Sequence, residues 1–116
     1  MGMTKTEMNP KATYGLGGAP ACRKLITIRF TSKGIVNHNQ PASAGDCIQW
    51  RDQTGVSRTL KFTAWPFTEA WQDIFVPANG YSNAFHVAAV PRASYPYVAS
   101  PMSAIGPPDP PSVVVG

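Results

Sequence analysis

Few residues in this sequence could hold a metal ion, and they are far apart. His38 lies in a polar stretch, His86 alternates with apolar residues, and Cys22 and Cys47 are the only thiols. The short His-x-x-x-His and Cys-x-x-Cys spacings of many zinc sites are absent from the sequence. We therefore expect no metal and no other cofactor. Two cysteines allow one disulfide without requiring it, and we favour two free thiols over a bond.

Catalytic combinations are also missing. The glycine-rich segment 15–18 superficially resembles a phosphate-binding loop, but it precedes a predicted strand and lacks the Lys-Ser/Thr ending of such loops. The carboxylates are scattered, and Glu69 and Asp73, the only pair at helical spacing, are interpreted as a solvated loop face. We expect that the protein is not an enzyme.

The charge distribution argues against nucleic acids and membranes as partners. Ten basic and six acidic residues give a net charge of +4, but the basic residues form no run. No apolar stretch approaches the roughly 20 residues of a membrane-spanning helix, and the N-terminus has no apolar core of a signal peptide. We expect a cytoplasmic chain, unless Met1 restarts the mature form of an exported protein.

The composition favours one all-β domain between two extended ends. The chain has 116 residues, of which 12 are proline and 10 glycine, and this composition favours many short elements. We predict a flexible or partner-binding arm over 1–21, a β-sandwich over 22–105, and a Pro-rich tail over 106–116, with both ends outside the core.

Apolar and polar residues alternate along several short segments, as in half-buried strands. The predicted strands are 25–30, 46–51, 58–62, 84–87 and 95–99. The predicted inward-facing residues are Ile26, Ile28, Phe30, Ile48, Trp50, Leu60, Phe62, Phe85, Val87, Tyr95, Tyr97 and Ala99. Segment 63–77 breaks the alternation and is predicted to be a long connection, with room for one helical turn at 68–71. Five strands and no long helix indicate a β-sandwich.

Three motifs in this order resemble those of cupredoxins of the plastocyanin and azurin type. Segment 45–50 (GDCIQW) is similar to their Gly-Asp-x-Val-x-Trp strand, and segment 57–62 (SRTLKF) to their Pro-His-Thr-Val-x-Phe strand. Segment 95–102 (YPYVASPM) resembles their closing Tyr-x-Tyr-x-Cys-x-x-His motif. The resemblance spans roughly 24–102 and implies a cupredoxin-like Greek-key β-sandwich.

The resemblance also implies that the copper ligands are replaced. In that family two histidines, one cysteine and a weak axial methionine hold the metal. Arg58 stands at the position of the first histidine, Ala99 at that of the cysteine, and Met102 at that of the second histidine. A guanidinium group and a methyl group cannot ligate copper, so we expect a scaffold without copper.

Two features are candidate binding sites. Arg58 is expected at the inward rim, either as a plug over the vacated position or as a site for a small anion. Trp65, Phe67, Trp71 and Phe75 concentrate aromatic side chains in the long connection. They form either a small core of the loop itself or a binding surface.

We therefore expect a non-catalytic, metal-free interaction or assembly module that binds a protein partner or associates with itself. One alternative is a small-molecule or carbohydrate binder that uses the tryptophans and Arg58. A second alternative is a copper-binding electron-transfer protein with atypical ligands.

Overall fold

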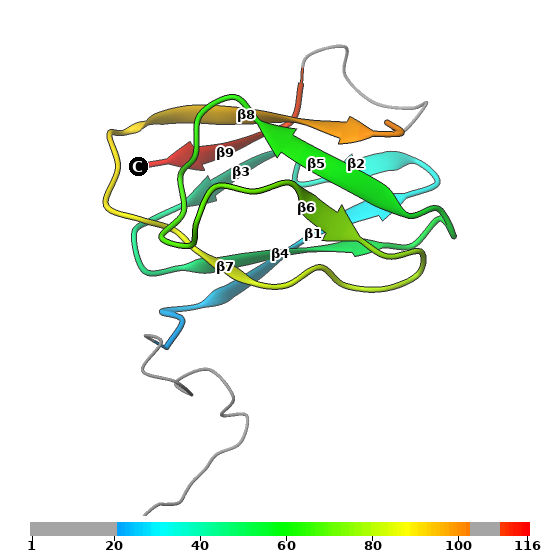
Figure 1. Cartoon of the computed structure of the whole chain (residues 1–116), viewed down its shortest axis with the longest axis horizontal. Helices are drawn as coiled ribbons and strands as arrows, with labels where there is room; N and C mark the ends of the chain where they lie inside the picture. The colour runs from blue at the N-terminus through cyan, green and yellow to red at the C-terminus, as the bar shows by residue number, and fades with distance from the viewer. Residues whose placement is uncertain (1–20, 103–109) are drawn as a thin grey trace, which may run out of the picture.

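The computed structural model describes residues 21–102 and 110–116, and this part of the chain forms nine strands in two sheets and no helix (Figure 1). The strands are β1 (Leu25–Thr31), β2 (Gly34–Val36), β3 (Asn39–Ala42), β4 (Cys47–Asp52), β5 (Arg58–Phe62), β6 (Ile74–Val76), β7 (Phe85–His86), β8 (Ala93–Ser100) and β9 (Ser112–Val115). Since none of these elements is a helix, the described residues contain no helix that could cross a membrane. The prediction of an all-β sandwich is confirmed.

The smaller sheet has the order β2-β1-β4-β7. Strands β1 and β4 run parallel, with Ile28 opposite Trp50, and β2 folds back on β1 through a tight turn. Gly34 opens β2 with a φ of 115°, a conformation that favours glycine. This sheet fixes the two ends of β4, Cys47 and Asp52, at opposite ends of the molecule.

The larger sheet has the order β3-β9-β8-β5-β6, so the C-terminal strand lies inside it (Figure 1). Strand β9 pairs in parallel with β3 and antiparallel with β8, and it buries Val113 and Val115. The prediction that the tail lies outside the core is therefore wrong for residues 112–115. Three consecutive valines have high strand propensity. The segment is short and follows prolines, so its sequence pattern alone does not predict a strand. Residues 1–20 of the arm predicted over 1–21 lie outside the described residues.

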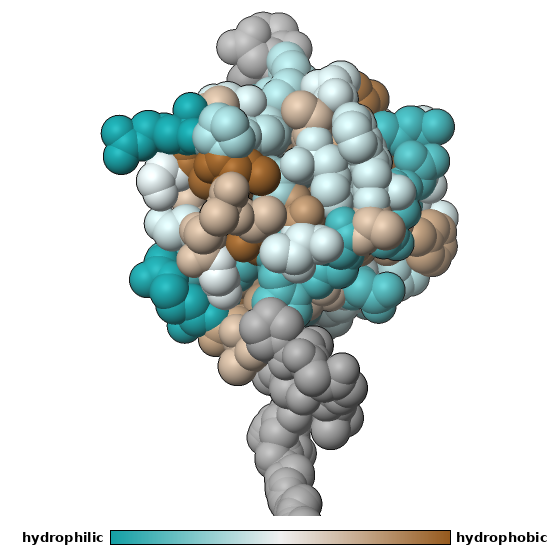
Figure 2. Space-filling model, turned by 60° about the vertical axis from the view of Figure 1, so that its left-hand side comes forward, coloured by the Kyte–Doolittle hydropathy of each residue, from teal (hydrophilic) through white to brown (hydrophobic). Residues whose placement is uncertain are grey.

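The core fills the space between the two sheets, and the predicted inward alternation of the strands is confirmed. Trp50 is fully buried and makes edge contacts with Phe62, Phe67 and Tyr97, at centroid distances of 5.5 to 6.2 Å. Its indole N–H donates to the Tyr97 hydroxyl at 3.1 Å. Burial raises the pKa of Tyr97 far above its usual range, although the Trp50 hydrogen bond acts in the opposite direction. On the face in Figure 2, brown patches are scattered among hydrophilic and intermediate side chains.

Two local expectations differ from the structure. Cys22 and Cys47 form a disulfide, with Cα atoms 5.3 Å apart, so the free-thiol expectation is wrong. Leu25 lies opposite Cys47 in the parallel β1–β4 pair, and this register brings Cys22 beside Cys47. No helical turn forms at 68–71, where the chain is irregular.

Candidate functional site

Asp52 is the centre of a polar cluster at the end of β4. Its carboxylate is fully buried. Oδ2 accepts hydrogen bonds from the backbone N–H groups of Gly55 at 2.8 Å, Val56 at 3.0 Å and Asn79 at 3.0 Å, and Oδ1 accepts one from the Thr54 hydroxyl at 2.5 Å. Burial by itself would raise the pKa of Asp52, but the hydrogen bonds from Asn79, Thr54 and Gly55 outweigh it and hold the pKa well below its usual range.

The turns around Asp52 exist because their residues tolerate unusual backbone angles. Gly55 has a φ of 82° and Asn79 a φ of 55°, in the left-handed region that glycine and asparagine enter most easily. A Cβ on Gly80 would lie 2.8 Å from Cγ of Pro77, so the turn also needs glycine for space. Both turns direct backbone N–H groups at one carboxylate.

Arg58 completes this cluster from the first position of β5. Its side chain is 5% exposed. Nη1 donates to the Pro101 carbonyl at 2.6 Å, Nη2 donates to the Thr54 hydroxyl at 2.8 Å, and Nε lies 3.5 Å from Oδ1 of Asp52. The guanidinium group also lies 4.8 Å from the centre of the Phe30 ring. The guanidinium donors therefore bond to groups of the protein itself, as a plug would.

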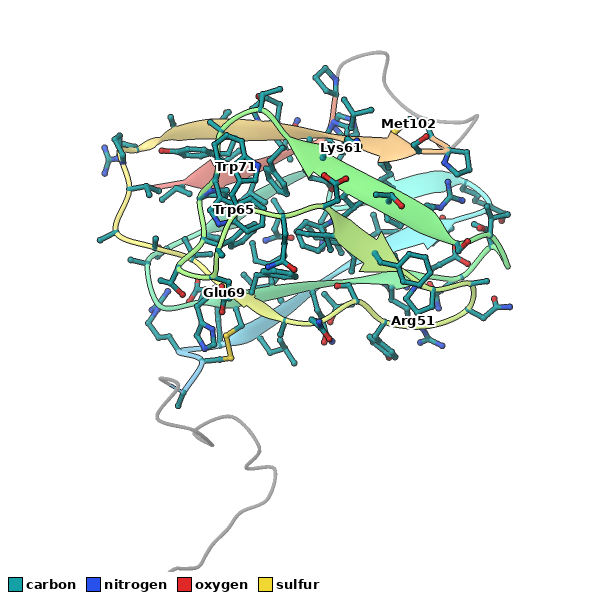
Figure 3. All side chains as sticks on the ribbon, viewed as in Figure 1. Arg51, Lys61, Trp65, Glu69, Trp71 and Met102 are labelled. Carbon is teal, nitrogen blue, oxygen red and sulfur yellow. A yellow bond between two sulfur atoms is a disulfide. The ribbon has the colours of Figure 1, made fainter. Side chains whose placement is uncertain are left out.

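Ala99 and Met102 lie at this same end of the molecule. Ala99 is buried and pairs with Leu60 across β5 and β8. The Ala99 N–H donates to Sδ of Met102 at 3.3 Å, while Met102 is 42% exposed (Figure 3). The backbone carbonyl of Pro101, the residue before Met102, accepts a hydrogen bond from Arg58 and so links Met102 to the cluster around Asp52 and Arg58. The structure therefore brings the three positions identified by the resemblance to one end of the sandwich.

The aromatic connection divides into a buried part and an exposed part. Phe67 is 4% exposed and packs edge-on against Trp50 and Phe62. Trp65 is half-buried, packs on Phe62 and donates its indole N–H to the Glu69 carbonyl. These two aromatics extend the core over the end of the sandwich, as the small-core interpretation expects.

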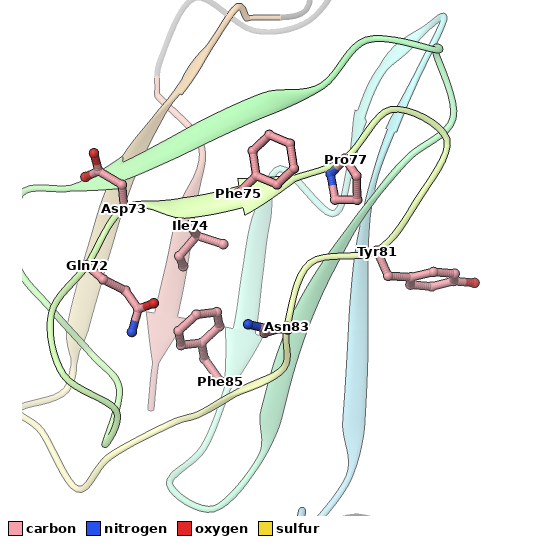
Figure 4. Close-up of a pocket in the computed structure, with 8 residues that line it drawn as sticks. All are labelled: Gln72, Asp73, Ile74, Phe75, Pro77, Tyr81, Asn83 and Phe85. Atoms are coloured by element: carbon pink, nitrogen blue, oxygen red, sulfur yellow. The ribbon is translucent and has the colours of Figure 1, made fainter.

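Trp71 and Phe75 form the exposed part. Trp71 stacks on Trp65 with the ring planes 11° apart and remains 59% exposed, and Phe75 of β6 is 60% exposed (Figure 3). Phe75 also borders a pocket of about 250 Å³, which lies between β6 of one sheet and the segment that leads into β7 of the other (Figure 4). Tyr81, 51% exposed, and Asn83 line the opposite side. Strand β6 is the edge strand of its sheet. The outer side of β7 is covered, because the Thr68 N–H donates to the His86 carbonyl and the Ala88 N–H donates to the Pro66 carbonyl.

A second polar cluster lies at the opposite end of β4. His86 of β7 pairs directly with Cys47, and its Nε2 lies 4.0 Å from Sγ of Cys22. Glu69 contacts His86 twice, through the ring Nδ1 at 2.7 Å and the backbone N–H at 2.9 Å. The alternation predicts that Cys47 and His86 face away from the core, and neither belongs to the core cluster, although Cys47 is fully buried. The alternation gives no register, so it does not predict that the two residues lie together. His38, the other candidate ligand in the sequence, is not part of this group.

Comparison with known proteins supports the fold and nothing finer. No protein-family model matches the chain, and no curated protein matches it. Solved structures of amicyanin do match. An oxidized proline-to-glycine mutant has a TM-score of 0.58 at 15% identity, over 79% of this chain and 82% of that one. A reduced tryptophan-to-tyrosine mutant has a TM-score of 0.60 at 13% identity, over 83% and 86%. Both the sequence motifs and these structures lead to the same conclusion, that this chain has a cupredoxin-like fold.

Proposed function

We propose that this protein is a cupredoxin-like scaffold without a blue-copper centre and that it serves as a non-catalytic interaction or assembly module. The observation that supports this most directly is the closure of one end of the sandwich by Arg58. A permanently charged guanidinium, held by Pro101, Thr54 and Asp52, occupies the position that the resemblance gives to a histidine ligand. In this proposal the protein has the cupredoxin-like scaffold but not the copper ligands of a blue-copper protein.

The residues at this end do not fit a copper ion. Blue-copper sites need a thiolate and two imidazoles, and the described residues offer neither group there. Ala99 has no donor atom, and Sδ of Met102 already accepts a hydrogen bond. A cation brought to this place would also meet the positive charge of Arg58. We therefore derive no electron-transfer step for this protein.

An interaction role is supported by the edge formed by β6 and the residues around it. Trp71 and Phe75 expose large aromatic surfaces, and aromatic side chains dominate the energetics of many interfaces. Strand β6 is an edge strand of only three residues, so its outer backbone groups are available to an added strand. We infer that a protein partner, or a second copy of this chain, packs on this aromatic edge, which we define as Trp71, Phe75 and Tyr81.

Light scattering coupled to size-exclusion chromatography tests this proposal. We expect a mass above the 12.4 kDa of one chain, and we expect Trp71→Ser with Phe75→Ser to reduce it. Leu25→Ser is the matched control, because Leu25 is 43% exposed but lies on the other sheet. A wild-type monomer, or a mass that falls equally in the control, would contradict association through this edge.

The pocket favours small-molecule binding as a second candidate function. The residues that line it include the aromatic side chains of Phe75 and Tyr81 and the amides of Gln72 and Asn83, which could contact a flat polar ligand such as a sugar ring. We expect such a ligand to change tryptophan fluorescence through the environment of Trp71, which precedes the lining residue Gln72 in the sequence. An unchanged emission across a panel of mono- and oligosaccharides would remove this candidate.

A further inference from the structure

The cluster at the start of β4 contains the ligand set of a metal site. Sγ of Cys22, Sγ of Cys47 and a ring nitrogen of His86 all lie within 4.8 Å of one another. Cys47 is fully buried, while Cys22 and His86 are half-buried. Two thiolates and one imidazole, with a fourth position left for water, are a known ligand set for zinc. In the present state the two sulfur atoms are bonded to each other, so neither can act as a thiolate.

Glu69 orients His86 for such a role. One carboxylate oxygen accepts from the ring Nδ1 at 2.7 Å, and the other accepts from the His86 backbone N–H at 2.9 Å. When the neutral ring donates its proton at Nδ1, the lone pair of Nε2 points toward the sulfur atoms. A carboxylate behind a histidine is the usual second partner of a metal-binding imidazole. His86 therefore already has the carboxylate partner that a metal-binding imidazole uses, while the sulfur atoms of Cys22 and Cys47 are bonded to each other.

We propose that reduction of the Cys22–Cys47 disulfide converts this cluster into a zinc site. A dithiol reductant supplies two electrons and two protons, which break the sulfur–sulfur bond and leave two thiols, while the reductant becomes a cyclic disulfide. Binding of Zn²⁺ then releases both thiol protons and forms two zinc–sulfur bonds and one bond to Nε2 of His86. The oxidised chain keeps the disulfide and does not bind the ion.

The movement required for this change is small. Sulfur atoms that share a tetrahedral zinc ion lie roughly 3.8 Å apart, and a sulfur and a nitrogen lie roughly 3.6 Å apart. The distance from Nε2 of His86 to Sγ of Cys22 is already 4.0 Å. The sulfur atoms must separate, and Cys22 can supply this movement because it precedes β1 and lies outside any strand. Cys47 and His86 remain fixed as paired residues of β4 and β7.

This zinc site is independent of the interaction role proposed above. It lies at the opposite end of β4 from Asp52 and Arg58, and it uses neither Trp71 nor Phe75. Whether zinc binds would depend on the oxidation state of Cys22 and Cys47 and not on the aromatic edge.

Zinc binding to oxidised and reduced protein tests the proposal. The chain is reduced with a dithiol, freed of reductant under anaerobic conditions, and titrated with Zn²⁺ in competition with a chromophoric chelator. We expect one zinc ion per reduced chain and none per oxidised chain. Co²⁺, used as a spectroscopic substitute, should give a thiolate-to-metal absorption. Zinc bound equally by the oxidised chain, or no zinc bound by the reduced chain, would overturn the proposal.

Variants separate a built site from thiols that bind metal without structure. His86→Ala should weaken zinc binding at least ~10-fold, and Glu69→Gln should weaken it by about 10-fold, because it removes the support of the ring. His38→Ala is the control and should leave affinity unchanged. If the reduced chain loses structure, zinc should restore its circular dichroism spectrum, and a spectrum that stays unfolded overturns the proposal. Equal affinity of wild type and His86→Ala would also overturn it.

Discussion

Replacement of Asp52 by asparagine should be among the most destabilising conservative changes in this chain. Asparagine has nearly the same shape, so the turns around it can keep their backbone path. One amide oxygen can still face the N–H groups of Gly55, Val56 and Asn79, while the amide nitrogen faces Thr54. What the change removes is the negative charge.

The expected loss follows from the hydrogen bonds that the charge strengthens. A bond to a charged acceptor contributes about 1 kcal/mol more than a neutral one, and three backbone donors share Oδ2. The sum is about 3 kcal/mol. The ion pair with Arg58 adds less, because the two atoms lie 3.5 Å apart. Asp52→Asn should therefore lower the free energy of unfolding by about 3 kcal/mol.

Urea unfolding at pH 7, followed by tryptophan fluorescence, measures this loss. Asp73→Asn is the matched control, since Asp73 pairs with Lys61 at 3.4 Å but both side chains are more than half exposed. Such a pair contributes less than about 1 kcal/mol. A loss below about 1 kcal/mol for Asp52→Asn, or a loss equal to that of the control, would refute the account of this cluster.

The same variant should change how stability depends on pH. The pKa of Asp52 is lower in the folded chain than its ordinary value of 3.8. Its contribution is therefore complete above that ordinary value and is lost as the pH falls toward the folded pKa. We expect the difference between wild type and Asp52→Asn to shrink as the pH is lowered from about 5 to about 2. A difference that stays constant over this range would contradict the lowered pKa.

Three further predictions follow from other parts of the molecule. A variant that combines Arg58→His, Ala99→Cys and Met102→His should bind copper with a strong thiolate-to-copper absorption, and a folded variant that stays colourless would contradict the alignment to cupredoxins. Val113→Ala should cost about 2 kcal/mol of unfolding free energy in urea, because Val113 is fully buried in β9, and a cost near zero would contradict the place of this strand in the core. Trp71→Ala should change stability by less than about 1 kcal/mol in the same assay, because Trp71 is 59% exposed, and a larger loss would assign it to the core.

Local pattern was enough to predict the core of the sandwich. Alternation placed Trp50 and Tyr97 inward because strand geometry alone sends successive side chains to opposite faces. The pairing of distant segments could not be obtained in this way. The parallel register of β1 and β4 brings Cys22 beside Cys47, where the disulfide forms. The pairing of β9 between β3 and β8 places a Pro-flanked tail in the core. Both features depend on contacts that no short window of sequence contains.

The candidate site was predicted in part. The inward position of Arg58 followed from its place at the start of an alternating segment. The sequence pattern does not identify Asp52 as the centre of a cluster, because three of its donors are close in sequence but the fourth, Asn79, is 27 residues away. An aspartate before Thr54 and Gly55 is a typical signal of a side chain that accepts from its own turn. That signal identifies the turn but not the partner, Arg58.

The central claim, an interaction module without copper at the Arg58 end, is tested most directly by one chromatography experiment. Protein supplied with Cu²⁺ is separated by size, and the molar mass and metal content of the eluted peak are measured together. The account predicts a mass above 12.4 kDa, lowered by Trp71→Ser with Phe75→Ser, and no thiolate-to-copper absorption. A monomer with one copper ion per chain and that absorption would contradict it, and a metal-free monomer would contradict self-association through the aromatic edge.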